Sequence, residues 1–440
     1  MAALDATAAL APTSPSSSYR HPYPRLAILG GGIAGLTLSI ALRKRSIPHV
    51  LFEATPAFGT VGAGIALGPN STRAMSIISP ELRAMYESMA SGNTSPEKQH
   101  VFADFLLSEP GLGQNRGFHG AEVGGGSFVK SSAYRKELID GLESMLDKDC
   151  INLGMRATAV TRDGDKVKVV FQDGSEHVFD AVIGCDGAKG VSRAAVVPPQ
   201  YVDAKYSGRY VYRALLPPGK AQEILGDIIK DGKIFIGQGV YFGLYPLSKG
   251  RYNFLCGTQK NMDWPDKQWT KGVTREEMLA DFAGCDERLL TFLQYVEPVR
   301  WALFHHFDTP TYASCRVALV GDVAHASTPH QGSGAGQCFE DVAVLSHLLT
   351  LVADKTDLDI AFDTYDTICR PRGQGIVHTS DEAGRIFTFT QPKLGDDIAA
   401  IAQNLQSRFT WIWEHDLQRD IRRAEEAFTQ RKTKLENGGG

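Results

Sequence analysis

The sequence lacks the features that mark several large classes of protein. It has no apolar stretch close to the roughly 18 residues that a membrane-spanning helix needs. It also has no long basic run, and its formal net charge is −4, which argues against nucleic acid as the main partner. With 43% hydrophobic and 22% charged residues, the composition is typical of a soluble globular protein. The length of 440 residues is enough for two or three domains.

Cysteine is scarce and forms no metal-binding pattern. The seven cysteines are scattered, their number is odd, and none of them form C-x-x-C. We therefore expect free thiols, a reducing compartment and no structural zinc. His325 and His330 lie in one glycine-rich loop without a third ligand nearby, so we expect no metal site.

The N-terminal residues do not look like a secretory signal. Residues 1–24 are rich in alanine, serine, threonine and proline, and they have no compact apolar core. Asp5 argues against a transit peptide, although a transit peptide in residues 1–24 stays open as an alternative. We expect a disordered tail at 1–24 and a cytoplasmic protein.

The clearest pattern is LAILGGGIAG, followed by a helical stretch, a second apolar run and an acid. Residues 26–29 form a short apolar run typical of a buried strand, and Gly30, Gly32 and Gly35 fit G-x-G-x-x-G. In such a turn the first glycine permits the tight bend and the second lets backbone approach a pyrophosphate. The third lets the helix pack closely on the sheet. Glu53 ends the next predicted strand, at a spacing typical of an acid that binds ribose hydroxyls. The stretch predicts a nucleotide-binding βαβ unit.

Two further glycine-acid motifs follow predicted buried strands. They are GCDG, which contains Asp186 and Gly187, and GDVAHASTPHQGSGAGQCFED, which contains Asp322. Because ligands bind beyond the carboxyl ends of the strands in an open α/β sheet, we expect all three motifs to converge on one dinucleotide. The glycines of the last motif leave backbone N–H groups bare ahead of an amphipathic helix predicted over 340–352. That setting stabilises a ring that becomes anionic on reduction.

The order of predicted elements divides the chain into an α/β part and a sheet-rich part. The α/β part has a Rossmann-like pattern, whereas the sheet-rich part shows short apolar or alternating runs between glycine and proline breaks. The predicted organisation is a tail at 1–24, a nucleotide-binding domain made of 25–95, 128–205 and 301–375, an irregular excursion at 96–127, an inserted, mostly antiparallel β-sheet domain at 206–300, and C-terminal helices at 376–440.

Five segments together resemble a known family. In order, they are GGGIAG with FE at 52–53, GAGI at 62–65, the arginine of AYRKEL, GCDGAKGVSR at 184–193, and GDVAHASTPHQGSGAGQCFED. This set resembles the single-component FAD-dependent aromatic monooxygenases, the salicylate and para-hydroxybenzoate hydroxylase group, over most of the chain. The resemblance implies an α/β fold in which a Rossmann-like FAD-binding domain carries an inserted substrate-binding sheet. It also implies FAD as cofactor, with NADPH or NADH and O2 as co-substrates.

The same resemblance implies which residues bind the cofactor. Glu53 would hold the adenosine ribose and Asp322 the ribityl chain, while Gly334 and Ala335 would lie against the flavin ring. The group has no separate Rossmann domain for the nicotinamide, in agreement with the absence of a second G-x-G-x-x-G. The full set of implied cofactor-binding residues is Gly30, Gly32, Gly35, Glu53, Ala63, Gly64, Arg135, Asp186, Gly187, Asp322, Gly334 and Ala335, of which Asp186 and Gly187 would also serve the nicotinamide.

A closer likeness is to fungal salicylate-hydroxylase-like enzymes, some of which hydroxylate and dearomatise polyketide phenols. YVYRALLP and GLYPLSKGRYN resemble the segments that carry their catalytic arginine and tyrosine, which implies catalytic roles for Arg213 and Tyr245. A flavin hydroperoxide delivers an electrophilic oxygen, so the ring reacts best as a phenolate, whereas a free phenol has a pKa of about 10. A nearby guanidinium lowers that pKa, and a tyrosine hydroxyl orients the ring.

We therefore expect an FAD-dependent, NAD(P)H-consuming monooxygenase that hydroxylates a phenolic small molecule, with or without loss of aromaticity. Two alternatives stay open: an epoxidase of the same fold acting on an alkene, and a flavin-fold binding protein without turnover. A halogenase is less favoured because the sequence has no W-x-W-x-I-P segment. The choice between NADPH and NADH and the oligomeric state also stay open.

Overall fold

A parallel sheet surrounds the first glycine motif. The computed structural model describes residues 23–59, 63–260, 263–264 and 268–438. In the six-stranded sheet β1 pairs in parallel with β2 on one side and with β11 on the other, and β18 is the antiparallel edge strand. Because both faces of the central strands are covered, they are apolar without alternation, as in the fully buried LAIL of β1. The strand order is β18 (Ala313–Ser314), β19 (Val317–Leu319), β11 (Ala181–Gly184), β1 (Leu26–Leu29), β2 (His49–Phe52) and β7 (Ile151–Asn152).

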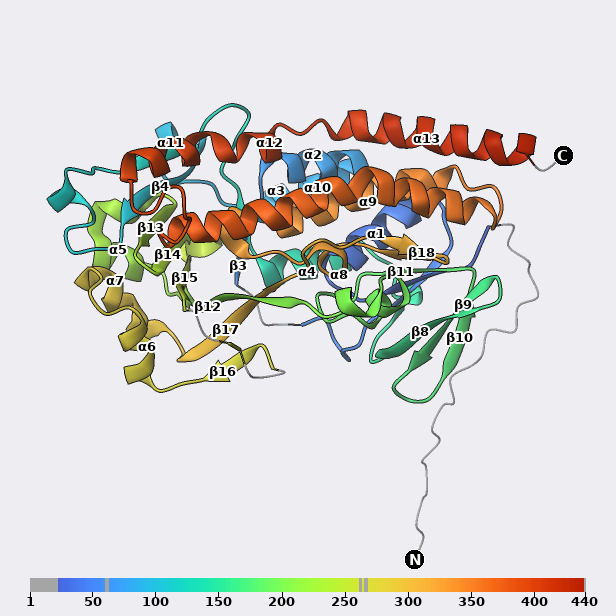
Figure 1. Cartoon of the computed structure of the whole chain (residues 1–440), viewed down its shortest axis with the longest axis horizontal. Coiled ribbons are helices and arrows are strands. Elements are labelled where there is room, and N and C mark those ends of the chain that lie inside the picture. Colours follow the sequence, from blue (N-terminus) through green and yellow to red (C-terminus); the bar gives the residue numbers. More distant parts are fainter. Residues whose placement is uncertain (1–22, 60–62, 261–262, 265–267, 439–440) are drawn as a thin grey trace, which may run out of the picture.

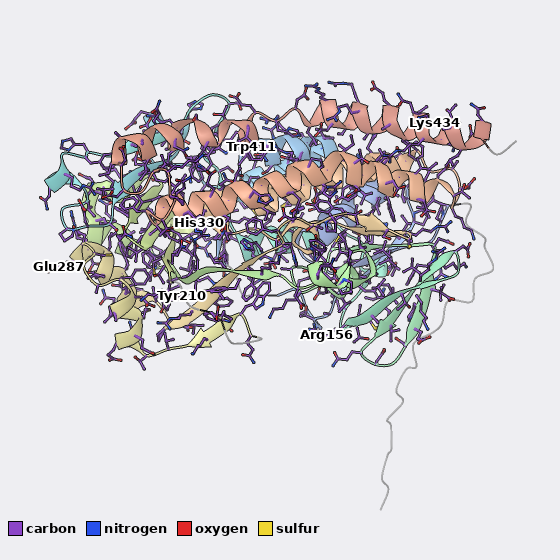
Figure 2. All side chains as sticks on the ribbon, viewed as in Figure 1. Arg156, Tyr210, Glu287, His330, Trp411 and Lys434 are labelled. Atoms are coloured by element: carbon purple, nitrogen blue, oxygen red, sulfur yellow. The ribbon has the colours of Figure 1, made fainter. Side chains whose placement is uncertain are left out.

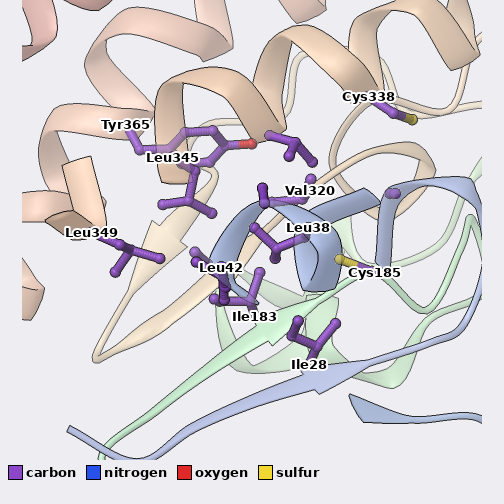
Figure 3. Close-up of a cluster of buried hydrophobic side chains, with 14 of the residues drawn as sticks. Ile28, Leu38, Leu42, Ile183, Cys185, Val320, Cys338, Leu345, Leu349 and Tyr365 are labelled. Carbon is purple, nitrogen blue, oxygen red and sulfur yellow. The ribbon is translucent and has the colours of Figure 1, made fainter. Parts of the chain in front are cut away.

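Three helices build the core above this sheet. Helix α1 (Ile33–Lys44) follows the glycine turn and packs against α9 (Gly334–Thr350), which in turn packs against α10 (Asp357–Phe387). Figure 3 shows the resulting cluster, with side chains from α1, α9 and α10 meeting those of β1 and β11. Helix α10 has 31 residues and a length of about 46 Å at 1.5 Å per residue. It therefore extends from the parallel sheet to the second sheet, as Figure 1 shows.

The second sheet has eight strands and is mostly antiparallel. All its neighbouring strands are antiparallel except β13 and β4, which are parallel. Even-numbered residues of β12 and β14 face one side, where they pack with helices α6 (Arg275–Asp281) and α7 (Glu287–Thr291). The strand order is β16 (Thr270–Gly272), β17 (Val299–His305), β12 (Lys205–Leu216), β15 (Tyr252–Gln259), β14 (Val240–Pro246), β13 (Lys233–Gly237), β4 (Val101–Leu107) and β5 (Ala121–Gly124).

Smaller elements complete the fold. A two-stranded sheet joins β3 (Gly64–Ala66) to β6 (Ser132–Tyr134), and a three-stranded sheet of β8, β9 and β10 lies apart from the eight-stranded sheet in Figure 1. The remaining strands and α-helices are β8 (Ala157–Asp163), β9 (Lys166–Phe171), β10 (Glu176–Phe179), α2 (Pro69–Ile78), α3 (Pro80–Met89), α4 (Arg135–Ser144), α5 (Lys220–Leu225), α8 (Asp322–His325), α11 (Ile398–Arg408), α12 (Thr410–Trp413) and α13 (Leu417–Gly438).

The structure corrects four details of the predicted organisation. The segment 96–127 is not irregular, because it supplies β4 and β5 to the eight-stranded sheet. The boundary predicted at residue 300 falls inside β17, and the boundary at 375 falls inside the continuous helix α10. The helix predicted over 340–352 begins earlier, at Gly334, and nearly all of it is buried, so its apolar residues do not mark an amphipathic surface helix.

Some expectations concern residues outside the described part of the chain. The tail predicted at 1–24 lies there except for its last two residues, and so does Gly62, the first residue of GAGI. Within the described residues, none of the helices is long and apolar enough to cross a lipid bilayer.

Candidate active site

The geometry of the first turn explains its three glycines. Gly30 has φ +103°, and a Cβ there would lie 2.4 Å from the carbonyl oxygen of Cys185. A Cβ at Gly35 would lie only 1.9 Å from the carbonyl oxygen of Gly30, so α1 can meet the turn only without a side chain. At Gly32, in contrast, no described atom lies within 4 Å of such a Cβ. Gly30 and Gly35 are therefore needed by the protein's own packing, whereas Gly32 leaves open space in front of the helix.

That open space belongs to a cavity of about 350 Å³ at the carboxyl ends of β1, β2 and β11. Gly30, Gly32, Glu53, Asp186 and Gly187 all line it, so the structure brings these predicted residues together. Helix α1 begins here at N-cap Gly32 without a side-chain cap among the described residues. Its unpaired N–H groups and its dipole suit an anionic group.

The two acids at this cavity have different surroundings. Glu53 accepts hydrogen bonds from the backbone N–H of Gly31 at 2.6 Å and of Thr55 at 2.8 Å, and it keeps a position at the cavity wall. Asp186 accepts hydrogen bonds from the backbone N–H and the hydroxyl of Ser192, at 3.0 and 2.5 Å. These bonds stabilise the loop between residues 186 and 192. Burial raises the pKa of Asp186, and the hydrogen bonds from Ser192 oppose that rise.

The third glycine motif lies at a second cavity of about 440 Å³. Asp322 begins α8 directly after Gly321, where φ is +79° and a Cβ would lie 2.9 Å from the Cys338 Sγ. Helix α9 starts at Gly334 with no side-chain cap within the described chain, so a second helix N-terminus with bare N–H groups faces this cavity. Buried Arg193 connects the second and third motifs, since its guanidinium donates to the carbonyl oxygen of Val323 at 2.8 Å.

The eight-stranded sheet provides the opposite wall of the second cavity. Successive side chains of a strand point to opposite faces, so the odd-numbered residues of β12 and β14 face away from α6 and α7. Arg213 on β12 and Tyr245 on β14 both line the cavity in this way. β15 lies between these two strands, which places them about 10 Å apart at a strand spacing of roughly 4.8 Å. The cavity-lining residues predicted from the sequence are Ala63, Gly64, Arg213, Tyr245, Asp322, Gly334 and Ala335.

Arg213 is held by an aromatic ring and not by an acid. Its guanidinium carbon lies 3.7 Å from the centroid of the Trp301 ring, and it forms no ion pair with any carboxylate of the described residues. Burial and the neighbouring Arg135 lower the pKa of Arg213, although an arginine stays charged under physiological conditions. The cavity wall therefore presents a positive charge whose hydrogen-bond donors are available to a ligand.

Tyr245 packs directly on the backbone of Gly64. A Cβ at Gly64 would lie 2.9 Å from the Tyr245 hydroxyl oxygen, and the Gly64 N–H donates to the Asn253 side chain at 2.7 Å. Burial raises the pKa of Tyr245, so its hydroxyl remains a neutral donor. The contact joins the predicted cofactor residue Gly64 to the predicted catalytic tyrosine.

Among the predicted cofactor-binding residues, Arg135 and Gly35 line neither cavity, and Gly35 packs against the Gly30 backbone. Arg135 has a different setting. It is exposed at the start of α4, and its backbone N–H donates to the carbonyl oxygen of Ala63 at 3.2 Å. His325 and His330 also separate: buried His325 lies 2.6 Å from Asp341 by its Nε2, whereas His330 lines the second cavity. Figure 2 shows His330 near the end of α10, in agreement with its ring contact to Phe387 at 5.7 Å.

Sequence reasoning missed several polar residues of the second cavity. Asn253 lies in the quoted motif GLYPLSKGRYN, but no spacing rule singled it out. Tyr241 and His330 form a ring contact at 4.9 Å, and neither the Tyr241 hydroxyl nor the His330 nitrogens have a hydrogen-bond partner in the described part of the chain. Lys130 comes from a stretch without any periodic pattern and reaches the same cavity.

The two cavities suit the parts of a flavin dinucleotide. The first offers an uncapped helix N-terminus, an acid and glycines with open space, which fit a pyrophosphate and a ribose. The second offers the bare backbone of the 332–335 loop and of Ala63–Gly64, which fits a flat ring. Both lie at the carboxyl edge of the same parallel sheet, where ligands bind in open α/β folds.

Comparison with known proteins identifies the family. A family model described as an FAD binding domain matches residues 150–380. The chain is also 35% identical over 419 residues to an FAD-dependent monooxygenase of Gibberella moniliformis, a match that covers 91% of this chain and 95% of that protein. The chain belongs to the FAD-dependent monooxygenases.

Other relatives match most of its length. The monooxygenase is 31% identical over 412 residues to a 6-methylsalicylate 1-monooxygenase of Aspergillus terreus, which covers 92% of each chain. A solved structure of a salicylate hydroxylase substrate complex is 29% identical, with a TM-score of 0.80, covering 92% of this chain and 98% of that one. The predicted family, fold class and FAD cofactor are thus confirmed.

Proposed function

We propose that this monooxygenase hydroxylates a phenolic aromatic compound, with NADPH or NADH as the electron donor. One oxygen atom of O2 enters the ring and the other leaves as water, while the nicotinamide gives up a hydride and a proton is consumed. The named relatives support an aromatic substrate, since one is a salicylate hydroxylase and another a 6-methylsalicylate 1-monooxygenase.

The observation that carries this proposal is the pairing of Arg213 with Tyr245. An arginine without an acidic partner and a neutral tyrosine hydroxyl line one cavity together with the glycine loop at 332–335. A phenol has a pKa of about 10, and a nearby positive charge lowers such a value by roughly 1–3 units. Arg213 would therefore keep the substrate as a phenolate near neutral pH, while Tyr245 donates to the same oxygen and fixes the ring.

The linings of the two cavities support specific roles for the predicted cofactor residues. Glu53 would accept hydrogen bonds from the adenosine ribose, and the N-terminus of α1 would face the pyrophosphate. Asp322 would bind the ribityl chain, and Ala63, Gly64, Gly334 and Ala335 would lie against the ring. The bound flavin supplies activated oxygen for the transfer. Arg135 would act through its contact with the Ala63 backbone and its charge near Arg213.

Asp186 and Gly187 are our candidates for a role shared between FAD and the nicotinamide, because they line the first cavity beside the glycine turn. We also place the enzyme in a reducing compartment such as the cytoplasm, since all seven cysteines are free thiols.

The test is turnover of the purified, FAD-loaded enzyme with a panel of phenols, NADPH or NADH, and isotopically labelled O2. We expect phenol-stimulated NAD(P)H oxidation and a product that contains one labelled oxygen atom. A dienone product would show that aromaticity is lost. Epoxides from alkenes without any hydroxylated phenol would favour the epoxidase instead, and a yellow protein that never consumes NAD(P)H would favour a flavin-fold binding protein.

A further inference from the structure

Lys130 is a buried lysine beside the tyrosine to which the proposed function assigns the phenolic oxygen. It precedes β6, only 5% of its surface is exposed, and it lines the second cavity. Its Nζ lies 4.8 Å from the centroid of the Phe102 ring and 5.2 Å from that of the Tyr245 ring. A ligand that reaches Tyr245 therefore also comes close to this amino group.

The amino group of Lys130 is not paired with an acid. It donates to the carbonyl oxygen of Phe102 at 2.9 Å, and it forms no ion pair with the carboxylates of the described residues. Lys233, the other lysine at this cavity, is paired with Asp104. Because an unpaired charge is costly to bury, the setting of Lys130 favours the neutral amine. The nitrogen of a neutral amine keeps a lone pair while it donates a hydrogen bond, so it can accept a proton.

The proposed reaction needs a proton acceptor at this cavity, because a phenol that reacts as a phenolate must first lose its hydroxyl proton. Arg213 cannot accept it, since an arginine stays protonated. Tyr241 and Tyr245 already carry their protons, because burial raises both pKa values. His330 is a weak base, because burial holds its pKa well below the ordinary value. Asp322 lies at the start of α8, on the side of the glycine loop and opposite the sheet.

A smaller cavity gives the proton a way onward from Lys130. Its volume is about 10 Å³, which is just enough for one water molecule, and Lys130 lines it as well. Its wall includes Ser71 and Gln331, whose buried Oγ and Nε2 atoms have no hydrogen-bond partner in the described part of the chain. The Gln331 Oε1 accepts from the hydroxyls of Thr379 and Ser380, so the amide is held in place. Unpartnered buried polar atoms are the usual ligands of a buried water.

We propose that Lys130 is the catalytic base that takes the hydroxyl proton from the phenolic substrate. The phenol O–H bond breaks, its proton forms an N–H bond with the lone pair of the Lys130 amine, and the electron pair stays on the oxygen. The resulting ammonium then gives a proton to a water molecule held by Ser71 and Gln331. This inference rests on the proposed function, in which Arg213 and Tyr245 hold the phenolic oxygen. Arg213 determines how far the phenol ionises, whereas Lys130 determines how fast.

The charges around Lys130 leave the proton transfer to its amine. Burial lowers the pKa of Lys130 to about 7, so the amine form is available near neutral pH. The amine fraction grows as the pH rises through about 7, and the rate of proton transfer should grow with it. The other titratable groups around it are Tyr86 of α3, Tyr245 of β14 and His330, which are neutral, Lys233 of β13 paired with Asp104 of β4, Glu340 of α9 paired with Arg372 of α10, and Arg213 of β12 and Asp322 of α8, which face the cavity with opposite sign.

The experiment follows the ionisation of a bound phenol in the FAD-loaded enzyme without NAD(P)H, so no turnover occurs. The probe is 3-nitrophenol, whose phenolate absorbs at a longer wavelength than the phenol itself. The preformed complex at pH 6 is mixed rapidly with buffer at pH 8, and the absorbance gives both the rate at which bound phenolate appears and its final amount. 3-Nitroanisole, which has no hydroxyl proton, is the matched ligand, and the flavin absorption spectrum reports its binding.

Two variants separate the base from its charge. Lys130→Met removes the amine and keeps much of the side-chain volume, whereas Lys130→Arg keeps a positive charge that cannot accept a proton near neutral pH. Both should slow the appearance of bound phenolate by about a hundredfold or more, the usual contribution of a general base. Both should leave the dissociation constant of 3-nitroanisole within about twofold. Arg213→Met, in contrast, should lower the final amount of bound phenolate. Lys136→Met, which removes a lysine from the surface of α4, should keep the wild-type rate.

Three results would overturn the inference. They are a wild-type rate in Lys130→Met, a wild-type rate in Lys130→Arg, which would show that only the charge matters, and a wild-type rate constant that is the same at final pH values from 6 to 8. Should Lys130→Met fail to retain FAD, Lys130→Arg and the wild-type pH series decide the question. If bound phenolate forms at a rate that does not depend on Lys130, the proposed function stands without this inference. If no bound phenolate forms in wild type, the proposed function itself fails.

Discussion

The two cavities of this monooxygenase are built in different ways. The cavity of about 350 Å³ beside the glycine turn is built from strand ends, a helix N-terminus and glycine backbone. The cavity of about 440 Å³ has a glycine loop on one side and, on the other, long side chains such as Arg213, Tyr245 and Lys130. The first cavity therefore offers mainly backbone with the single acid Glu53 at its wall, whereas the second offers long side chains from the sheet.

The two regions should also differ in how well they tolerate amino-acid substitutions. Close packing of backbone on backbone leaves no room at Gly30 or Gly35, so a substitution there disturbs the fold itself. The side chains of the sheet face a cavity, where a substitution changes the ligand's surroundings and leaves the strand pairing intact. Each of the following variants tests one side of this contrast.

The largest effect should come from Gly35→Val. Its Cβ would lie 1.9 Å from the Gly30 carbonyl oxygen, a backbone atom that cannot move without opening the turn. We expect loss of bound FAD together with a lower melting temperature. The matched control is Gly32→Ala, whose Cβ meets no described atom within 4 Å and whose φ of −78° suits any residue. Gly32→Ala should leave the melting temperature of the apoprotein unchanged and weaken only FAD binding. If both variants lower the melting temperature equally, the two glycines do not differ in their role in packing.

The next largest effect should come from replacing Arg213. This change should lower turnover and leave FAD binding and the melting temperature unchanged. Without the guanidinium the pKa of the bound phenol should rise by roughly 1–3 units, so Arg213→Met should lower kcat/KM near neutral pH by about a hundredfold. Arg213→Lys should recover only part, because a point charge does not reproduce the planar donor fork or its stacking on Trp301. Steady-state kinetics and the ratio of product to NAD(P)H consumed measure this. If both variants keep the wild-type kcat/KM and the wild-type ratio of product to NAD(P)H consumed, Arg213 has no role in the reaction.

Glu53→Ala should affect the cofactor and spare the chemistry. Losing a charged acceptor for ribose hydroxyls costs about 1.5–3 kcal/mol, which weakens FAD binding roughly tenfold to a hundredfold. Because Glu53 also accepts from the N–H groups of Gly31 and Thr55, the turn loses some support as well. FAD retention on dilution measures the affinity, and kcat at saturating FAD should stay close to that of wild type. If the variant retains FAD as well as wild type does, Glu53 only stabilises the backbone of Gly31 and Thr55 and does not bind the ribose.

The same contrast explains what the sequence could predict. The strand, turn and helix around Gly30 follow from local spacing: β1 has the predicted bounds, and α1 and β2 follow it in the predicted order. Residues 96–127 looked irregular because β4 pairs with β13, more than 100 positions away along the chain, and β5 pairs only with β4 at the edge of the sheet. Long-range pairing of this kind leaves little periodic trace in the strands themselves.

Lys130 was missed for a related reason. A single lysine between Val129 and Ser131 is, by sequence, a solvated residue, and only the packing of Phe102 and Tyr245 around it reveals burial. Arg213 and Tyr245 were predicted only through the family resemblance, because alternation in a strand does not tell which face carries a cavity.

The smallest effect should be that of Tyr245→Phe. This variant distinguishes orientation of the substrate by the Tyr245 hydroxyl from stabilisation of the phenolate by the charge of Arg213. The variant loses one neutral donor to the substrate oxygen, worth about 0.5–1.5 kcal/mol, while Arg213 remains. A weaker interaction with the phenolate raises the pKa of the bound phenol, so the pH at which activity appears should shift upward by roughly half to one unit. Since burial raises the pKa of Tyr245 itself, its own ionisation does not contribute near neutral pH. The pH profile of kcat/KM measures the shift, and the product formed per NAD(P)H measures orientation. If the pH profile of kcat/KM is unchanged but less product forms per NAD(P)H, Tyr245 only orients the substrate. If neither quantity changes, Arg213 alone binds the phenolic oxygen.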